Sequence, residues 1–481
     1  MTMWLTTVME VLFTGAVASL LVDFGAKRYG ARRGLMVGIV SVIVLFISIL
    51  FVLLDWPANG GLSLIQPAAS YLASSYTYDR LSVFASLAIL VVGLVVAAYS
   101  MGYLGALDNH GPFFALLLFL MGSLIGIVSA GDYLSLFLFW EGMSVSAYAL
   151  VAYSRSQLSL EASMKYFFMA GVGSLVALYG IAVIYSVTGS LQLTSIVGIG
   201  GSTLGVFGLA VLVLGLGVEA AVVPLHTWLP DVYSTAPIPS ASLISGAVTG
   251  AGVFAILKVL EPLVPGEVSF GGLPNVQALQ VMLASLALVT MFVGNLSGLY
   301  QSNLRRLLSF SSVAQTGYML AALSTFSIPG LVAVVFTMWN HGILKSNFFM
   351  LLGKENSNYE NAELQYLEGA GRKDRPLGFL YASSALAMMG APPFGMFWSE
   401  ILVILALVSA NGPFLWLAVA VVGNILLSIG YYYRIINRIV FGKSESVVPK
   451  RPLSDLLPSS ALLLLSILTG LLPFLFLNGI L

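Results

Sequence analysis

The chain has 481 residues and no net charge at neutral pH; 59% of the residues are hydrophobic and 8% are charged. Soluble globular domains carry roughly a quarter charged residues, so the composition excludes a soluble protein and indicates one that lies in a bilayer. The lack of cysteine excludes disulfides, thiolate metal sites and cysteine-held iron-sulfur clusters in this chain. No basic run is typical of a nucleic-acid surface, and no nucleotide loop, metal-ligand cluster or nucleophile arrangement is present.

Apolar runs of about twenty residues recur along the chain, and that length crosses a hydrocarbon core as a helix. They predict an all-α polytopic membrane protein with about fourteen transmembrane helices. The spans are expected to begin near residues 4, 34, 80, 112, 132, 162, 204, 238, 276, 303, 328, 377, 413 and 457. The first span lacks a basic leader and a small-residue cleavage site, so we expect it to be retained rather than removed as a signal peptide.

The basic residues predict the orientation, because lysine and arginine concentrate on the inner side of a membrane. With the N-terminus outside, sixteen of the twenty Lys and Arg residues fall in inner connections. Arg80 lies at an outer span end, and the remaining three fall inside apolar spans; they are Lys165, Lys258 and Lys345. A wrong span count would scramble this alternation, so the pattern favours both the count and an outer N-terminus.

Four glutamates lie within hydrophobic segments, whereas most other acidic residues fall in connections or at span ends. They are Glu10, Glu141, Glu219 and Glu400. An ionisable group in hydrocarbon costs at least about 2.5 kcal/mol, so such residues are usually paired, hydrated or functional. We expect Glu10 at an interface and the other three on an ion path.

Two hydrophobic stretches are too long for simple spans and carry prolines near their centres. Residues 204–234 contain Pro224 and Pro230, and residues 377–410 contain the pair at 392 and 393. Proline removes a hydrogen bond and interrupts a helix, so both stretches should be broken helices. Interrupted helices at matching positions are typical of transport sites, because the freed backbone groups can hold water and ions.

The predicted broken helices are the seventh and twelfth spans, and their odd offset of five predicts two inverted five-helix repeats. Lys165-Tyr-Phe-Phe-Met in the sixth span echoes Lys345-Ser-Asn-Phe-Phe-Met in the eleventh. The predicted domains are N-terminal flanking helices 1–3 at residues 1–110, a first repeat (helices 4–8) at 111–262, a second repeat (helices 9–13) at 275–442 and a C-terminal helix 14 at 452–481.

The two most specific motifs resemble an antiporter-like membrane-subunit family shared by complex I, Mrp antiporters and membrane-bound hydrogenases. Pro224-Leu-His-Thr-Trp-Leu-Pro-Asp231, followed by Ala236-Pro237, is similar to the family's most recognisable stretch, just after the seventh-span break. Arg305-Arg-Leu-Leu-Ser-Phe-Ser-Ser-Val-Ala-Gln-Thr-Gly-Tyr318 resembles its tenth-span opening.

Further motifs extend the resemblance over roughly residues 110–440. Trp140-Glu141 matches the fifth-span acidic motif of the M-, N- and L-type complex I subunits and the D-type Mrp subunit. Asn340-His341-Gly342 with Lys345 matches the eleventh span, and Gly390-Ala-Pro-Pro393 with Glu400 matches the twelfth.

The resemblance implies a proton relay across the membrane centre, built in this family from a fifth-span glutamate, two lysines in spans seven and eight, and a charged residue in span twelve. Glu141 and Glu400 fit the first and last stations. The seventh-span lysine position is Glu219 here, seven residues before the motif histidine, and the eighth-span position falls at Gly250. Two basic stations are thereby missing. Either other groups carry the path, namely Lys165, His226, Lys258, His341 and Lys345, or the path is altered or lost.

Every candidate also has a structural interpretation. Glu141 could sit in a static buried pair, and Lys165 or Lys345 could snorkel or anchor a helix break. Lys258 is close enough to an interface to reach water. Glu219 could be neutral and hydrogen-bonded to unwound backbone, and Glu400 could cap the second half-helix. The histidines could be shuttles or plain hydrogen-bonding groups.

The resemblance implies a proton-translocating, antiporter-like subunit of a redox-driven respiratory complex, related to complex I or membrane-bound hydrogenase. No cofactor is expected in this chain; iron-sulfur clusters would lie in partner subunits. The expected partners are other membrane subunits, the bilayer, and protons with sodium as a second candidate ion, in the plasma membrane of a prokaryote or an equivalent energy-coupling membrane. Two alternatives stay open: the D-type subunit of a multisubunit sodium/proton antiporter, and a non-conducting scaffold subunit.

Overall fold

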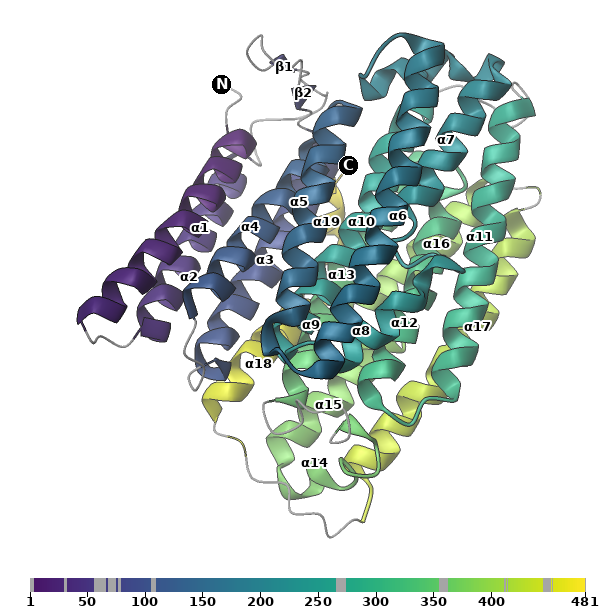
Figure 1. Cartoon of the computed structure of the whole chain (residues 1–481). Coiled ribbons are helices and arrows are strands. Elements are labelled where there is room, and N and C mark those ends of the chain that lie inside the picture. The colour runs from purple at the N-terminus through teal and green to yellow at the C-terminus, as the bar shows by residue number, and fades with distance from the viewer. Residues whose placement is uncertain are drawn as a thin grey trace.

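The computed structural model is built almost wholly of helices that lie side by side in one bundle (Figure 1). It describes residues 4–29, 33–55, 66–67, 75–76, 79–104, 110–264, 274–353, 362–410, 412, 414–443, 451 and 453–480. The N-terminal helices form one edge of the bundle, and α11 and α17 lie at the opposite edge (Figure 1). The predicted helical membrane class is therefore confirmed.

In the described ranges, the first part of the chain contains ten α-helices, one break and a short pair of strands. The helices are α1 (Trp4–Tyr29), α2 (Arg33–Asp55), α3 (Arg80–Tyr103), α4 (His110–Ser129), α5 (Tyr133–Val151), α6 (Gln157–Thr188), α7 (Thr203–Leu216), α8 (Leu229–Thr235), α9 (Ile238–Leu243) and α10 (Thr249–Leu260). Strands β1 (Gln66–Pro67) and β2 (Ser75–Tyr76) pair antiparallel. A single π-turn, Ile244–Val248, joins α9 to α10.

The second part of the chain also consists of long helices and contains one break. Its helices are α11 (Pro274–Leu299), α12 (Leu304–Leu323), α13 (Ile328–Leu352), α14 (Ala370–Lys373), α15 (Arg375–Met388), α16 (Gly395–Ala410), α17 (Phe414–Ile435), α18 (Leu453–Leu471) and α19 (Pro473–Ile480). A π-turn, Ile436–Val440, extends α17.

Short polar side chains set where the helices begin. Asp132 accepts a hydrogen bond from the Ser135 amide at 2.8 Å and so caps α5. Asn303 likewise accepts from the Arg305 amide at 3.0 Å at the start of α12. Such caps satisfy amides that the first turn of a helix leaves free, which matters more where water is excluded. At the other end, α6 stops at Gly189, whose φ of 66° favours glycine.

Nine helices in the described ranges are long and apolar enough to cross a bilayer. The pair α18 and α19 is bent by 82° and would make a tenth span if it is one broken helix. Large apolar side chains lie on the outer surface, among them Phe24 at 71% exposed and Leu175 at 69%, where lipid rather than water would cover them. The chain is thus an integral membrane protein, while the count of fourteen spans stays a prediction.

Both expected breaks are present. The first follows α7, where residues 217–224 leave the helix, a 3-10 turn covers Leu225–Trp228, and α8 resumes with Pro230 in its first turn. The second separates α15 from α16 at residues 389–394, around the two prolines. In each case the prolines that predicted the interruption lie at or beside it.

Helix α13 forms the centre of the bundle. Every residue from Gly330 to Leu352 is buried. The helix packs against α3, α9, α10, α12, α15, α16 and α18. Close approach between the π-turn at Ile244–Val248 and α13 depends on glycine at Gly246 and Gly342, which face each other across the contact. The positions of His341 and Lys345 on α13 therefore bring both into the protein interior.

Candidate ion path at the two helix breaks

The first break presents Glu219 to the interior. This side chain is 1% exposed, and its carboxylate accepts hydrogen bonds from Ser144 Oγ at 2.7 Å and Tyr166 Oη at 2.6 Å. The Tyr166 ring stacks on Trp228, with centroids 4.2 Å apart. Trp228 in turn donates from Nε1 to the Val218 carbonyl at 2.8 Å. One carboxyl is thus held by α5, α6 and the turn after the break together.

The backbone at this break is held in an uncommon conformation. Ala221 has a φ of 56°, which residues with a side chain seldom adopt and which persists only where the surroundings fix it. Thr316 of α12 donates from Oγ1 to the Ala220 carbonyl at 2.8 Å. Thr290 of α11 accepts from the Val223 amide at 3.2 Å. Two helices of the second half thereby fix the first break.

Glu141 lies on α5 one turn before Ser144 and is half-buried. Residues three apart on a helix are neighbours, with roughly 5–6 Å between their Cβ atoms, so Glu141 lies next to the residue that binds Glu219. Its Oε1 atom is buried and has no hydrogen-bond partner within the described residues. Two carboxyl groups therefore meet on the α5 side of the break, where the family pattern has a carboxylate and a lysine.

Lys165 lies beside a charged cavity instead of next to Glu141 or Glu219. Its Nζ is 2.6 Å from Asp231 Oδ2, and Arg306 lies 3.3 Å from the other oxygen of the same carboxylate. The cavity has a volume of about 410 Å³, and Glu161 also lines it. The Lys165 side chain is 43% exposed. Sequence reasoning placed Lys165 in an apolar span and missed its partner, although Asp231 stands inside the strongest motif.

His226 follows Pro224 in the first break and is partly exposed. Its ring faces Phe310 of α12, with centroids 6.3 Å apart. The Nδ1 atom is buried and has no hydrogen-bond partner within the part of the chain that the structure describes. Nδ1 could therefore take part in a hydrogen bond at the edge of the break.

Lys258 lies apart from both breaks, near the expected outer end of α10. The ammonium group is 3% exposed and forms ion pairs with Asp79 and, at 3.2 Å, with Glu261. Asp79 also caps α3 through the Ser82 amide. Burial would raise the pKa of the Asp79 carboxyl, but the Lys258 charge and the hydrogen bonds from Lys258 and Ser82 hold it below its usual value. The sequence suggested that Lys258 reaches water, but its ammonium group is buried in ion pairs instead. This geometry fits a structural role for Lys258 better than a relay station.

Two basic side chains occupy α13 in the second half, one turn apart. Lys345 is fully buried and donates to the Leu308 carbonyl at 2.8 Å and to Tyr432 Oη at 3.4 Å. Tyr432 also shares a hydrogen bond with Ser311 at 2.6 Å. His341 is 1% exposed, and its Nε2 has no partner among the described residues. The neighbours of Lys345 that bind it are thus neutral oxygens.

Glu400 lies on α16, just after the second break, and is 8% exposed. One carboxylate oxygen, Oε2, lies against Gly390 in the break, where any side chain would overlap it. The other, Oε1, is buried without a hydrogen-bond partner in the described ranges. It borders a small cavity that α12, α13 and α17 also line; the polar residues there are Gln315, Tyr318, Thr337 and Ser399.

Gly250, which stands where the family pattern has the eighth-span lysine, has little room for a side chain. A Cβ at Gly250 would lie 2.8 Å from Met338 Cγ of α13. A lysine there would need Met338 to move, so methionine from α13 fills the space that the family pattern assigns to a basic side chain. The sequence shows the glycine, but only the structure shows that Met338 fills the space of the missing lysine side chain.

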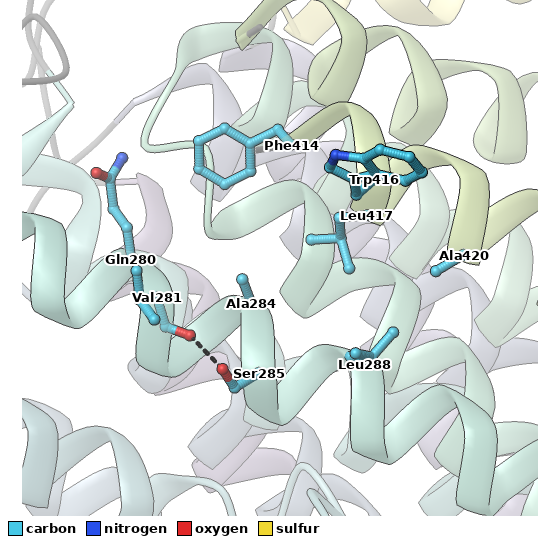
Figure 2. A pocket seen from close by; sticks show the side chains of 9 residues that line it. All are labelled: Gln280, Val281, Ala284, Ser285, Leu288, Phe414, Trp416, Leu417 and Ala420. Carbon is cyan, nitrogen blue, oxygen red and sulfur yellow. Dashed lines mark hydrogen bonds between the residues drawn. The ribbon is translucent and has the colours of Figure 1, made fainter. Parts of the chain in front are cut away.

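Another groove is apolar and lies at the edge of the bundle. It is formed by α11 and α17, has a volume of about 330 Å³, and includes Trp416 and Leu417 (Figure 2). Its polar lining is confined to Gln280 and Ser285, and the Ser285 hydroxyl is already bonded to the Val281 carbonyl at 2.7 Å. None of the candidate relay residues lines this groove.

Comparison with known proteins agrees with this architecture. Residues 130–427 match the family described as NADH:quinone oxidoreductase/Mrp antiporter, TM. NADH-quinone oxidoreductase subunit N of Thiobacillus denitrificans is 31% identical, over 96% of this chain and 94% of that protein.

Two solved structures extend the agreement to the whole fold. A chain of the membrane-bound sulfane sulfur reductase, an archaeal respiratory membrane complex, has a TM-score of 0.86 and 28% identity over 98% of this chain and 96% of its own. A chain of the Mrp complex from Dietzia sp. DQ12-45-1b shares the fold, with a TM-score of 0.86 and 21% identity over 100% of this chain and 97% of its own. The motifs, the two breaks and these matches identify the chain as a member of the NADH:quinone oxidoreductase/Mrp antiporter family.

Proposed function

We propose that this chain conducts protons as an antiporter-like membrane subunit of a redox-driven respiratory complex. The observation that carries the proposal is the pair of buried carboxyl groups, Glu219 and Glu400, one at each helix break. Broken helices with ionisable groups inside a membrane protein are the usual setting of ion binding. The relatives named above, a subunit of NADH-quinone oxidoreductase and a chain of an archaeal respiratory complex, support the same conclusion.

In the first half, protons would enter from the charged cavity at Lys165 and Asp231 and pass to Glu219 and Glu141. Tyr166 follows Lys165 on α6 and binds Glu219, and His226 lies in the turn at the break, so both would serve this step. The Tyr166 and Ser144 hydroxyls touch both oxygens of Glu219, so each can transfer a proton along a hydrogen bond. Two carboxyls sharing this site need no lysine, because a proton on one of them removes the repulsion between them.

In the second half, His341 and Lys345 on α13 and Glu400 on α16 would continue the path. Lys258 is included only as an outer-side group, because its two ion pairs hold it in place. Moving one proton against 100 mV costs about 2.3 kcal/mol. A change of that size is within reach of one rearranged charge pair, which a redox event in a partner subunit would drive.

The proposal includes the topology predicted from the sequence. Described helices begin near each of the fourteen expected starts, which supports fourteen spans, the N-terminus outside, and inverted repeats at residues 111–262 and 275–442. The flanking parts would be residues 1–110 and 452–481. The membrane would be the plasma membrane of a prokaryote or its equivalent, and the partners other membrane subunits. Iron-sulfur clusters would lie in those partners.

A D-type subunit of a sodium/proton antiporter is a second candidate, supported by the fold shared with the Mrp complex. A non-conducting scaffold is a third, supported by Glu219 and Gly250 in place of the two family lysines. Vesicles that carry the intact complex separate these possibilities, with proton uptake driven either by the redox substrate or by a sodium gradient.

The decisive variant is Glu141→Gln, compared with Glu261→Gln as a matched control at the outer end. We expect Glu141→Gln to lower redox-driven uptake at least tenfold and Glu261→Gln to leave it within a factor of two. Unchanged uptake in Glu141→Gln, with normal assembly of the complex, would support the scaffold. Uptake driven by a sodium gradient alone would support the antiporter subunit.

A further inference from the structure

One face of α6 leads from the charged cavity to an exposed apolar surface. Five residues of this helix follow one another at intervals of three or four and therefore lie on the same face. They are Glu161, Lys165, Phe168, Val172 and Leu175. Phe168 and Val172 are each 60% exposed, and Leu175 is 69% exposed. Charged groups followed by exposed apolar groups match the order of headgroup and acyl chain in a phospholipid.

The length of α6 places the charged end of this face at the boundary of the hydrocarbon core. The helix has 32 residues and is therefore about 48 Å long. A hydrocarbon core is about 30 Å thick, so an upright, centred α6 extends beyond it by about six residues at each end. Glu161 and Lys165 then lie beside the lipid headgroups, and the residues from Phe168 to Leu175 lie beside the acyl chains of the same leaflet.

The charges at the cavity leave one cation and one anion for a ligand. Lys165 and Arg306 both lie beside the single carboxylate of Asp231, so one of the two positive charges is not balanced there. Glu161 lines the same cavity and accepts a hydrogen bond from Gln157 Nε2 at 3.0 Å. In the described ranges no Lys, Arg or His nitrogen lies within 4.0 Å of the Glu161 carboxylate. A ligand that balances both charges carries one negative and one positive group.

We propose that the charged cavity and this face of α6 bind one phospholipid that has a primary amine, the chemistry of phosphatidylethanolamine. The lipid phosphate would accept hydrogen bonds from Lys165 and Arg306, and the ammonium group would donate to Glu161. One acyl chain would lie along Phe168 and Val172. The cavity volume of about 410 Å³ leaves room for the headgroup. This lipid site goes beyond the proposed ion path and can exist without it.

The test is photo-cross-linking in vesicles that contain the intact complex. Three lipids are compared, each with a photoreactive group in one acyl chain: phosphatidylethanolamine, phosphatidylglycerol and phosphatidylcholine. We expect phosphatidylethanolamine to label α6 between Phe168 and Leu175 more strongly than the other two. The reason is that phosphatidylglycerol has no amine and that the quaternary amine of phosphatidylcholine has no N–H to donate, whereas a primary ammonium group has three.

Two variants separate the charges of the site. Glu161→Gln removes the negative charge that would bind the amine, and we expect it to lower labelling by phosphatidylethanolamine about threefold, as for a partly exposed charge pair. Arg306→Gln should lower labelling by all three lipids, because each has a phosphate. The matched controls are Glu368→Gln and Arg438→Gln, which break another exposed ion pair and should label α6 as wild type does.

Equal labelling of α6 by the three lipids in wild type would overturn the proposal, and so would unchanged labelling in Glu161→Gln. Absence of labelling by any lipid would overturn it too, because a partner subunit would then cover this face. Assembly is checked by the subunit composition of the purified complex. Glu161 is exposed, so Glu161→Gln remains decisive if Arg306→Gln prevents assembly. No ion movement is measured, so this proposal and the proposed function can fail separately.

Discussion

The two helix breaks hold their carboxyl groups in opposite ways. At the first, both Glu219 oxygens accept hydrogen bonds from hydroxyl groups of neighbouring helices. At the second, Glu400 Oε1 has no partner within the described residues and borders a small cavity. The first carboxyl lies near a second carboxyl, Glu141, whereas the other residues that line the cavity beside Glu400 are neutral. Two similar proline breaks thus differ: one carboxyl accepts hydrogen bonds on both oxygens, and the other has an oxygen without a hydrogen-bond partner in the described ranges.

The largest expected effect distinguishes the two carboxyls directly. Glu219→Ala would leave the Ser144 and Tyr166 hydroxyls without an acceptor inside the protein, at a cost of about 1–3 kcal/mol for each. Glu400→Ala removes a group with no such donors and should cost less. Thermal unfolding of the detergent-solubilised complex measures the difference. Equal destabilisation by the two variants would contradict the contrast between the breaks.

A smaller change tests one of the two donors. Tyr166→Phe removes the hydroxyl that binds Glu219 while keeping the ring stacked on Trp228. We therefore expect the free energy of unfolding to fall by about 1–3 kcal/mol and proton uptake to become slower. Tyr318→Phe, beside Glu400, is the control at the second break. The initial rate of uptake in vesicles should fall more in Tyr166→Phe; the reverse order would show that the second hydroxyl is the more important one.

The backbone gives a third test. Gly390 has a φ of 71° and no room for a side chain beside Glu400, so Gly390→Ala should destabilise the protein by at least about 1–2 kcal/mol. At the first break, Ala221→Gly relaxes a φ of 56° and should be neutral or stabilising. The unfolding temperature should fall in Gly390→Ala and should stay the same or rise in Ala221→Gly. A destabilised Ala221→Gly would mean that its methyl group packs more strongly than the backbone strain costs.

The smallest effect is expected at the rim of the charged cavity. Asp231→Asn weakens the pairs with Lys165 and Arg306, but these side chains are 31–43% exposed, and exposed ion pairs contribute only about 0.2–1 kcal/mol. The difference from wild type should shrink further at high salt, because salt screens exposed charges. A salt-independent loss above this range would show that the cavity is closed to solvent.

Charge and proline were enough to predict much of this arrangement. Pro224 and the pair at 392 and 393 predicted both breaks, and two of the three glutamates expected on the path lie at or just after them, namely Glu219 and Glu400. These signals are local: a proline disrupts its own helix, and a charge in an apolar run is visible without any knowledge of packing. The long apolar runs predicted the helices for the same reason.

The partners of those glutamates could not be predicted in this way. Ser144, Tyr166, Gln315 and Thr337 are neutral polar residues that are common in any membrane helix, and only the packing of distant helices brings them to a carboxyl. Lys258 shows the converse, since its charge suggested a relay station but its buried ion pairs tie α3 to α10. Gln315 did carry one signal, its place inside the tenth-span motif.

The central position of α13 has a thermodynamic consequence for the two halves. This helix packs on elements of both, and it carries the two buried basic groups, His341 and Lys345. If α13 has two arrangements, any ion that favours one of them in the second half must favour the same one in the first, and by the same free energy in return. The proton affinities of Glu400 and Glu219 would then be linked, and the affinity of each carboxyl would depend on whether the other is protonated.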